Sequence, residues 1–481
     1  MPKVPNISSL AGSISILALS NLAAHLVVVL SIPIITRYYS PESYGYLASF
    51  LAATMFLSHI MTMKYELAIP IAKEKDSSNS LVALSSLILF GMGSVFLLVT
   101  YYAPSFSEWV LLKFKSVGFS THKLAVILIL ASMASAILHI LKQVCIRDKK
   151  IVSLAASNVT RVIATVLFQL LAVFFAADNF MLLLSVLVGF AAAAIILVPQ
   201  CKPICNNEFN LKQAASLHKD FPLFTLPATA LNSFSTALIP VLILISYDAQ
   251  VSGYYGMALR LLGIPMALLG MALNLVFLAK FSEFNKSNNY KASASLIKKY
   301  VFFHVTILFP IYILCWFLTP YIIPVFLGQE WAPLSLYIQI ILPWSALQFL
   351  SSPISSYVIV KLQNRKAALV GACEFTLRML AFYTGFFVDS SFVSILLYSL
   401  SGCLISIIYT FWILNLSGAM KDRRFLKSNA LRMLCILLSF FLMWVLYKVF
   451  SELALLLTFI LTVAQIYKPM QKVAKETFGG K

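Results

Sequence analysis

Three arginines lie within segments that are long and apolar enough to cross a membrane. Arg161 and Arg378 each fall about 11 residues into such a segment, and at about 1.5 Å per residue this depth is near the middle of the bilayer. Arg260 lies closer to the outer end of its segment. A guanidinium in hydrocarbon is costly, so each should face water, a carboxylate or an anion. Its planar fork donates two hydrogen bonds at once, which suits a diphosphate.

Each arginine also has a structural interpretation. Glu374 lies four residues before Arg378, and at that spacing on a helix the two charges are neighbours that neutralise each other. Arg161 has no acidic residue in its own segment. Arg260 has two candidate carboxylate partners near the outer surface, Asp248 and Glu42. The sequence leaves both interpretations open for all three arginines.

Further polar residues recur at helical spacing within the apolar segments. Asn158 lies three residues before Arg161, with Gln169 farther along the same face, and Asn21 and His25 are four residues apart in the first segment. Lipid disfavours such stripes whereas a water-filled cavity accommodates them, so they predict a polar cavity. The candidate substrate-binding residues are Arg161, Arg378, Arg260, Asn158, Asn21 and His25.

A second set of residues has the types that coupling or gating requires. Lys64 and Glu66 lie side by side at the end of the second apolar segment, shortly after His59. Glu374 completes the set through its spacing from Arg378. The structural alternatives are ion pairs at the membrane interface for the charged residues and helix packing for the histidine. No residue pattern predicts a metal site.

The elements that must position these residues are membrane-spanning helices. Of the 481 residues, 60% are hydrophobic and only 11% are charged, and the mean hydropathy is +0.90, which excludes a soluble protein. About fourteen segments are long enough to cross a hydrocarbon core of about 30 Å, which predicts an all-α polytopic protein. The predicted spans are 12–36, 43–63, 80–101, 124–142, 151–176, 180–198, 222–246, 252–277, 300–319, 334–360, 367–388, 392–416, 431–447 and 453–467.

Two features refine these spans. Pro227, Pro240 and Pro265 predict kinks within 222–246 and 252–277. Polar residues are nearly absent from three other spans, for which we expect lipid exposure: 180–198, 392–416 and 453–467.

The basic residues determine the predicted orientation. The chain has 36 Lys and Arg and a net charge of +19. With the N-terminus inside, 28 of the 36 fall in inner loops such as 142–150, or in the tails, which predicts both termini in the cytoplasm. The outer segments hold only Arg37, Lys113, Lys115, Lys123 and Lys448. Because the excess charge is topological, we do not expect nucleic acid as a partner.

The chain contains an internal repeat. The segment 39–46 has an echo in 247–254, 208 positions later, and the segment 147–161 has one in 364–378. These echoes predict two six-helix lobes of the same orientation, related by an axis along the membrane normal, with a substrate cavity between them. The predicted parts are an N-lobe (1–200), a cytoplasmic linker (201–221), a C-lobe (222–418) and a C-terminal helix pair with its tail (419–481).

Two stretches carry a family resemblance. One runs from Pro33-Ile34-Ile35-Thr36-Arg37-Tyr38-Tyr39-Ser40 through Tyr44-Gly45 to Lys64-Tyr65-Glu66-Leu67-Ala68-Ile69. The other runs from Phe221-Pro222-Leu223 through Gly253-Tyr254-Tyr255-Gly256-Met257-Ala258-Leu259-Arg260-Leu261-Leu262 to Pro265 and Phe277. Both resemble the polysaccharide-transport family, the O-antigen and exopolysaccharide flippases of the multidrug/oligosaccharidyl-lipid/polysaccharide (MOP) exporter superfamily.

The resemblance implies a function. The expected cargo is an oligosaccharide linked to undecaprenyl diphosphate, moved by alternating access with an H⁺ or Na⁺ gradient, and no cofactor is expected. The expected location is the bacterial cytoplasmic (inner) membrane. Expected partners are membrane lipids, a polysaccharide polymerase and a chain-length regulator.

Three alternatives remain. A multidrug exporter of the same superfamily should offer acidic or aromatic groups to a cationic drug, whereas the charge in the middle of these spans is positive. A peptidoglycan-precursor flippase would carry a similar diphosphate. A membrane polysaccharide polymerase or ligase would be an enzyme, but the largest outer loop, 101–122, has no acid pair or Ser/His constellation, so we expect no enzymatic activity.

Overall fold

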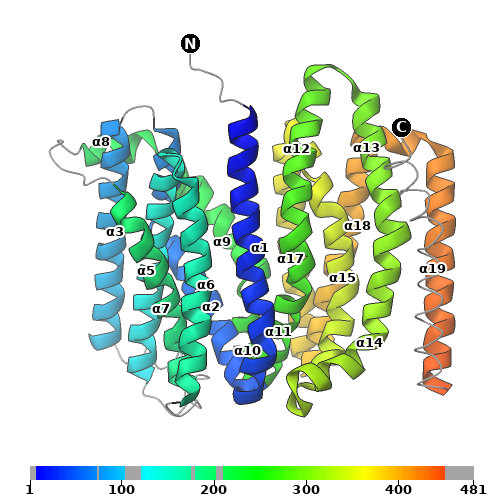
Figure 1. Ribbon diagram of the computed structural model, residues 1–481, viewed down its shortest axis with the longest axis horizontal. Coiled ribbons are helices and arrows are strands. Elements are labelled where there is room, and N and C mark those ends of the chain that lie inside the picture. The colour runs from blue at the N-terminus through cyan, green and yellow to red at the C-terminus, as the bar shows by residue number, and fades with distance from the viewer. Residues whose placement is uncertain (1–6, 73–74, 103–120, 175–178, 202–209, 450–481) are drawn as a thin grey trace. The chain divides into compact units, whose positions relative to one another are not determined.

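The computed structural model describes residues 7–72, 75–102, 121–174, 179–201 and 210–449 (Figure 1). Within these ranges every element of secondary structure is helical. Ten helical segments are long and apolar enough to cross a membrane, and each predicted span up to 431–447 overlaps a helical segment. The last predicted span, 453–467, lies outside the described residues. Two compact units divide the chain, Met1–Met257 and Ala258–Lys481.

Unit 1 is built on six long helices: α1 (Ile7–Tyr38), α2 (Pro41–Met61), α3 (Lys75–Tyr102), α5 (Thr121–Arg147), α6 (Ile151–Phe174) and α7 (Asn179–Leu197). The start of α2 is specified locally, because the Ser40 hydroxyl accepts a hydrogen bond from the Ser43 backbone N–H and Pro41 occupies the first turn. Shorter elements follow these helices: the 3₁₀ helices η1 (Tyr65–Ile71) and η3 (Val198–Gln200), and α8 (Leu211–Leu217). Buried residues of α2, η1, α3 and α5 form one core cluster of the unit.

Half of the most apolar window of α7 is buried within the protein, so the predicted lipid exposure can apply to only part of this helix. It packs against both α5 and α6 (Figure 1). A side chain at Gly189 would place its Cβ 1.9 Å from the Thr165 hydroxyl oxygen and 3.0 Å from the Arg161 carbonyl oxygen, so only glycine allows α6 this close. Within a membrane an apolar helix is compatible with lipid and with other helices alike, so hydropathy alone does not decide its neighbours.

The predicted kinks divide two spans into shorter helices. The span 222–246 consists of a π-helical turn η4 (Phe221–Thr225), α9 (Leu226–Thr236) and α10 (Ile239–Ser246), and Pro240 lies in the first turn of α10. The span 252–277 consists of α11 (Ala249–Pro265), a π-helical turn η5 (Met266–Gly270) and α12 (Met271–Lys286). Proline lacks the N–H that would continue the helical ladder, and α11 accordingly ends at Pro265.

The first echo of the sequence repeat forms a reciprocal contact within unit 1. At an offset of 208, Pro41 corresponds to Ala249 and Gly45 corresponds to Gly253. A Cβ on Gly45 would lie 1.8 Å from the Ala249 carbonyl oxygen, and a Cβ on Gly253 would lie 1.8 Å from the Pro41 carbonyl oxygen. The starts of α2 and α11 therefore cross at backbone contact, where the sequence echo places Gly45 and Gly253.

This crossing predicts a large stability effect for Gly45→Leu. The new side chain must displace the backbone of α11, and overpacking of this kind costs about 1–3 kcal/mol. Gly91→Leu is the matched control, because a Cβ on Gly91 meets nothing within 4 Å. Thermal unfolding of both purified variants in detergent checks the prediction, which is wrong if the two variants unfold at the same temperature.

Unit 2 contains the remaining long helices: α13 (Tyr290–Phe303), α14 (Phe309–Leu327), α15 (Leu334–Ile354), α17 (Asn364–Phe387), α18 (Ser391–Leu416) and α19 (Arg423–Val449). Short elements connect them: a π-helical turn η6 (His304–Leu308), η7 (Gln329–Trp331), α16 (Ser356–Val360) and η8 (Ala419–Lys421). Its core includes Phe277, Phe281 and Tyr300, whose rings pack edge to face or tilted. An ion pair of 2.8 Å between Lys298 and Asp422 holds the start of α19 against α13, and its hydrogen bond lowers the pKa of Asp422.

Candidate functional site

Arg161 is positioned by the packing of α6 on α7. Its carbonyl oxygen accepts a hydrogen bond of 2.8 Å from the Thr165 hydroxyl, and its guanidinium lies 5.8 Å from the centre of the Phe190 ring. Farther along the same interface, the Gln169 amide donates to the Ser185 hydroxyl at 3.0 Å. Gln169 is thus used to join helices, and only part of the predicted polar stripe remains for a cavity.

Asn158 connects three helices one turn before Arg161. Its side-chain oxygen accepts a hydrogen bond of 2.8 Å from the Lys142 ammonium of α5, and its side-chain nitrogen lies 3.5 Å from the Asn21 side-chain oxygen of α1. Lys142 forms no ion pair with a carboxylate in the described part of the chain. Arg161 is close enough for its charge to act on Lys142. Two cations therefore lie close together beside neutral amides.

A third cation adjoins this pair. The Lys64 ammonium lies 3.0 Å from His59 Nδ1 and 3.8 Å from Glu66 Oε1, and the His59 ring lies 5.5 Å from the ring of His139. The charges of Lys64, Lys142 and Arg161 all act on His139. We call these three cations the basic cluster. Elements far apart in sequence supply it, and Glu66 pairs with its Lys64.

The segment that carries Lys64 and Glu66 is strained. Met63 and Lys64 have φ angles of 49° and 62°, in the left-handed region that is unfavourable for residues other than glycine. Both charged residues follow the span Pro41–Met61 and are nearly sealed from solvent. Burial raises the pKa of Glu66 and lowers the pKa of Lys64, and their mutual attraction opposes both shifts. Glu66 Oε2 has no hydrogen-bond partner among the described residues.

The raised pKa of Glu66 predicts a pH dependence of stability. The folded protein holds this proton more tightly than the unfolded chain, so stability should fall as pH rises from the ordinary value of 4.5 through the raised pKa. Glu66→Gln cannot ionise, so its melting temperature should decline less over that window. Thermal unfolding in detergent between about pH 5 and pH 8 measures both slopes. Glu283→Gln, at an exposed carboxylate, should keep the wild-type slope, and equal slopes for Glu66→Gln and wild type would contradict the prediction.

Arg378 occupies a very different environment in unit 2. Its side chain is only 2% exposed, and it forms an ion pair of 2.7 Å with Glu374 one turn earlier on α17. It also donates a hydrogen bond of 3.0 Å to the Tyr398 hydroxyl, and its guanidinium lies 4.4 Å from the centre of the Trp344 ring. Three neighbours thus enclose the cation, an arrangement suited to holding α15, α17 and α18 together.

Two further candidates lie on other helices. His25 is half-buried on α1, one turn after Asn21, and Arg260 is half-buried on α11 in unit 2. The candidates that come together in unit 1 are Arg161, Asn158, Asn21, Lys64, His59 and Glu66, whereas Arg378 and Glu374 form a separate pair. Lys142 and His139, two polar residues of the predicted span 124–142, also belong to the group in unit 1. Their spacing of three residues on one helix face was the available signal.

Comparison with known proteins defines the family. The model of a family described as "Polysaccharide biosynthesis protein" matches residues 34–336. The lipid II flippase MurJ, in an inward closed conformation, aligns with a TM-score of 0.65 at 15% identity, over 94% of this chain and 98% of that one. An inward-facing multidrug resistance MATE transporter of the MOP superfamily aligns with a TM-score of 0.62 at 12% identity, over 84% and 99%. No curated protein sequence matches the chain.

These likenesses and the membrane-length helices define a class. The protein is a multi-pass membrane protein with the fold of MOP superfamily transporters, and its solved structural neighbours are transporters. The match to more than half of the chain identifies the particular family. The chain belongs to the polysaccharide biosynthesis protein family.

Proposed function

We propose that this protein is a flippase that carries oligosaccharides linked to undecaprenyl diphosphate from the cytoplasmic to the outer leaflet, for surface polysaccharide synthesis. The observation that carries the proposal is the basic cluster of unit 1. Lys142 and Arg161 repel each other when no anion is present, and a diphosphate relieves that repulsion as it binds. The Arg161 guanidinium donates hydrogen bonds to two phosphate oxygens, and the Lys142 ammonium supplies a further positive charge. The side-chain amides of Asn158 and Asn21 add neutral donors.

The cargo would move by alternating access. A polar, cationic path accommodates the diphosphate and the sugars while the prenyl tail stays in lipid. Glu66 is the proposed coupling group, because its raised pKa favours proton uptake and Lys64 provides a charge that senses its ionisation. We therefore favour H⁺ over Na⁺ as the coupling ion. The C-terminal helix pair predicted within 419–481 has no role assigned by these residues.

The proposed location is the bacterial cytoplasmic membrane, with both termini in the cytoplasm. The distribution of Lys and Arg along the sequence supports this orientation. A polysaccharide polymerase and a chain-length regulator would act on the product in the outer leaflet. We propose no enzymatic activity for the chain itself.

Transport in reconstituted vesicles tests the proposal. The purified protein is placed in vesicles loaded with fluorescent undecaprenyl-diphosphate oligosaccharide, and a reagent outside reports the lipid that arrives. Vesicles with wild-type protein should show faster movement of this lipid than vesicles without protein. An imposed pH gradient should change the rate of movement. Movement of lipid II at a higher rate would indicate a peptidoglycan-precursor flippase, and export of a cationic dye alone would indicate a multidrug exporter. Lengthening of the glycan would identify a polymerase instead.

A further inference from the structure

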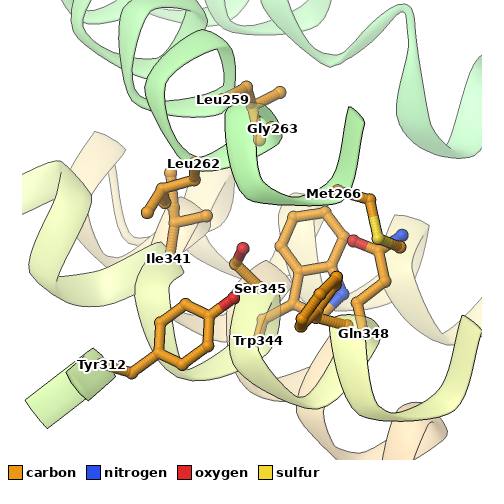
Figure 2. A pocket seen from close by; sticks show the side chains of 10 residues that line it. Leu259, Leu262, Gly263, Met266, Tyr312, Ile341, Trp344, Ser345 and Gln348 are labelled. Carbon is orange, nitrogen blue, oxygen red and sulfur yellow. The ribbon is translucent and has the colours of Figure 1, made fainter. Parts of the chain in front are cut away.

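Unit 2 contains a pocket of its own, apart from Arg378. Its cavity volume is about 100 Å³. Residues of α11, η5, α14 and α15 line it: Leu259, Leu262, Gly263, Met266, Tyr312, Ile341, Trp344, Ser345, Gln348 and Phe349 (Figure 2). None of these lining residues is charged, so the pocket differs chemically from the basic cluster.

Four of the lining residues present polar groups that the fold does not use, and one of these is the Trp344 indole N–H, which has no hydrogen-bond partner among the described residues. The Tyr312 hydroxyl, the Ser345 hydroxyl and the Gln348 side-chain amide form no hydrogen bond with any other residue in the described part of the chain. Figure 2 shows the two hydroxyls on one side of the Trp344 ring and the amide on the other. In an otherwise apolar membrane protein, most polar side chains bond within their own or a neighbouring helix, as Gln339 and Ser399 do. Four unused groups at one pocket therefore indicate a polar ligand.

The pocket walls are held by irregular but well-packed helical turns. Met266 begins the π-helical turn η5, and His304 begins the π-helical turn η6. The His304 ring lies against Tyr312 and Phe349, at 6.5 Å and 5.7 Å, and its Nε2 lies 3.0 Å from the Ala346 carbonyl oxygen. π-Helical turns are rare and occur frequently at functional sites. Two of them beside one pocket support a binding role.

The chemistry of the lining selects the ligand class. A phosphate or carboxylate would need a cation, which the lining lacks. A prenyl or acyl chain would leave the two hydroxyls and the amide without partners, which is unfavourable. A sugar ring matches both parts of the lining, because its hydroxyls exchange hydrogen bonds with the polar groups and its C–H faces pack on Tyr312, Phe349 and the aliphatic wall.

We propose that this pocket binds one sugar ring of the transported oligosaccharide. The proposal rests on the flippase function above, and it assigns to unit 2 the recognition of the neutral part of the cargo. Tyr312, Ser345 and Gln348 form hydrogen bonds with sugar hydroxyls. Trp344 is the positioning residue between them, because Arg378 and Tyr398 pack against its ring and hold it in place.

Binding measurements on the full-length protein in nanodiscs test the assignment. The probes are undecaprenyl diphosphate alone and the same lipid carrying N-acetylglucosamine, glucose or galactose. Wild-type protein should bind at least one of the sugar-bearing lipids about three- to tenfold more tightly than the bare lipid, as expected for one or two neutral hydrogen bonds. Tyr312→Phe and Gln348→Leu should each reduce that advantage and leave the affinity for the bare lipid unchanged. Tyr383→Phe, which removes an exposed hydroxyl on α17, is the matched control and should keep the advantage.

The outcomes separate this proposal from the proposed function. Absence of any sugar advantage in wild type, or an advantage that survives both pocket variants, overturns the sugar site while the flippase function stands. Loss of binding to all four lipids would overturn the flippase function, and the sugar site with it. Normal melting temperatures of the variants show that a reduced advantage does not come from misfolding.

Discussion

Arg161→Ala is expected to lower transport of lipid-linked oligosaccharide by about 10- to 100-fold, the effect of losing one or two charge-assisted hydrogen bonds to phosphate. Arg161 lies on α6 beside Lys142, and the amides of Asn158 and Asn21 adjoin them. The remaining Lys142 would hold the diphosphate as a point charge without the bidentate fork. The measurement is the transport rate in vesicles, normalised to the amount of folded protein.

The same assay distinguishes charge from geometry. Arg161→Lys keeps the cation but loses the planar fork, so its rate should fall between those of wild type and Arg161→Ala. Lys280→Ala is the control, because Lys280 is exposed and pairs only with the exposed Glu283. If Arg161→Ala moved the lipid at the wild-type rate, the basic cluster would not be the diphosphate site.

Glu374→Gln is expected to lower the free energy of unfolding by about 3 kcal/mol, since loss of one partner leaves the Arg378 cation buried without its counter-charge. Arg378 would retain the Tyr398 hydroxyl and the Trp344 ring, and neither carries a negative charge. Thermal or denaturant unfolding in detergent measures the effect. Glu283→Gln breaks an exposed pair on α12 and should change the free energy by less than about 0.5 kcal/mol.

Transport by Glu374→Gln decides between two roles for this pair. If the pair is structural, the rate per folded molecule should stay near that of wild type while stability drops. The opposite pattern, normal stability with lost transport, would return Arg378 and Glu374 to the substrate-binding and gating roles that the sequence suggested. Arg378→Ala supports the structural role only if it shows the same pattern as Glu374→Gln.

Two arginines of this protein, Arg161 and Arg378, show how residues of one type acquire different contacts in different environments. Arg161 and Arg378 occupy matching positions in the second sequence echo. One is half-buried and lies within reach of another cation, whereas the other is enclosed by a carboxylate, a phenol and an indole.

The sequence by itself determined the class, the spans and the repeat. Hydropathy is a local property that each segment carries alone, and so each described span was predicted where a helical segment is found. The echo of Gly45 in Gly253 was equally readable, and the structure adds that these two copies touch at backbone distance. The three prolines likewise marked where two spans divide, because proline acts on its own helix.

The tertiary structure alone decided which polar residues form contacts between helices and are therefore not part of a cavity. Gln169 and Arg378 looked like cavity residues, but Ser185, Tyr398 and Trp344 engage them from neighbouring helices. Lys142 joined the site only because α5 places its ammonium against Asn158 of α6. Helical spacing assigns a residue to a face of its helix, but hydrogen bonds and ion pairs between helices depend on which face meets which neighbour. That choice is made by packing over the whole unit.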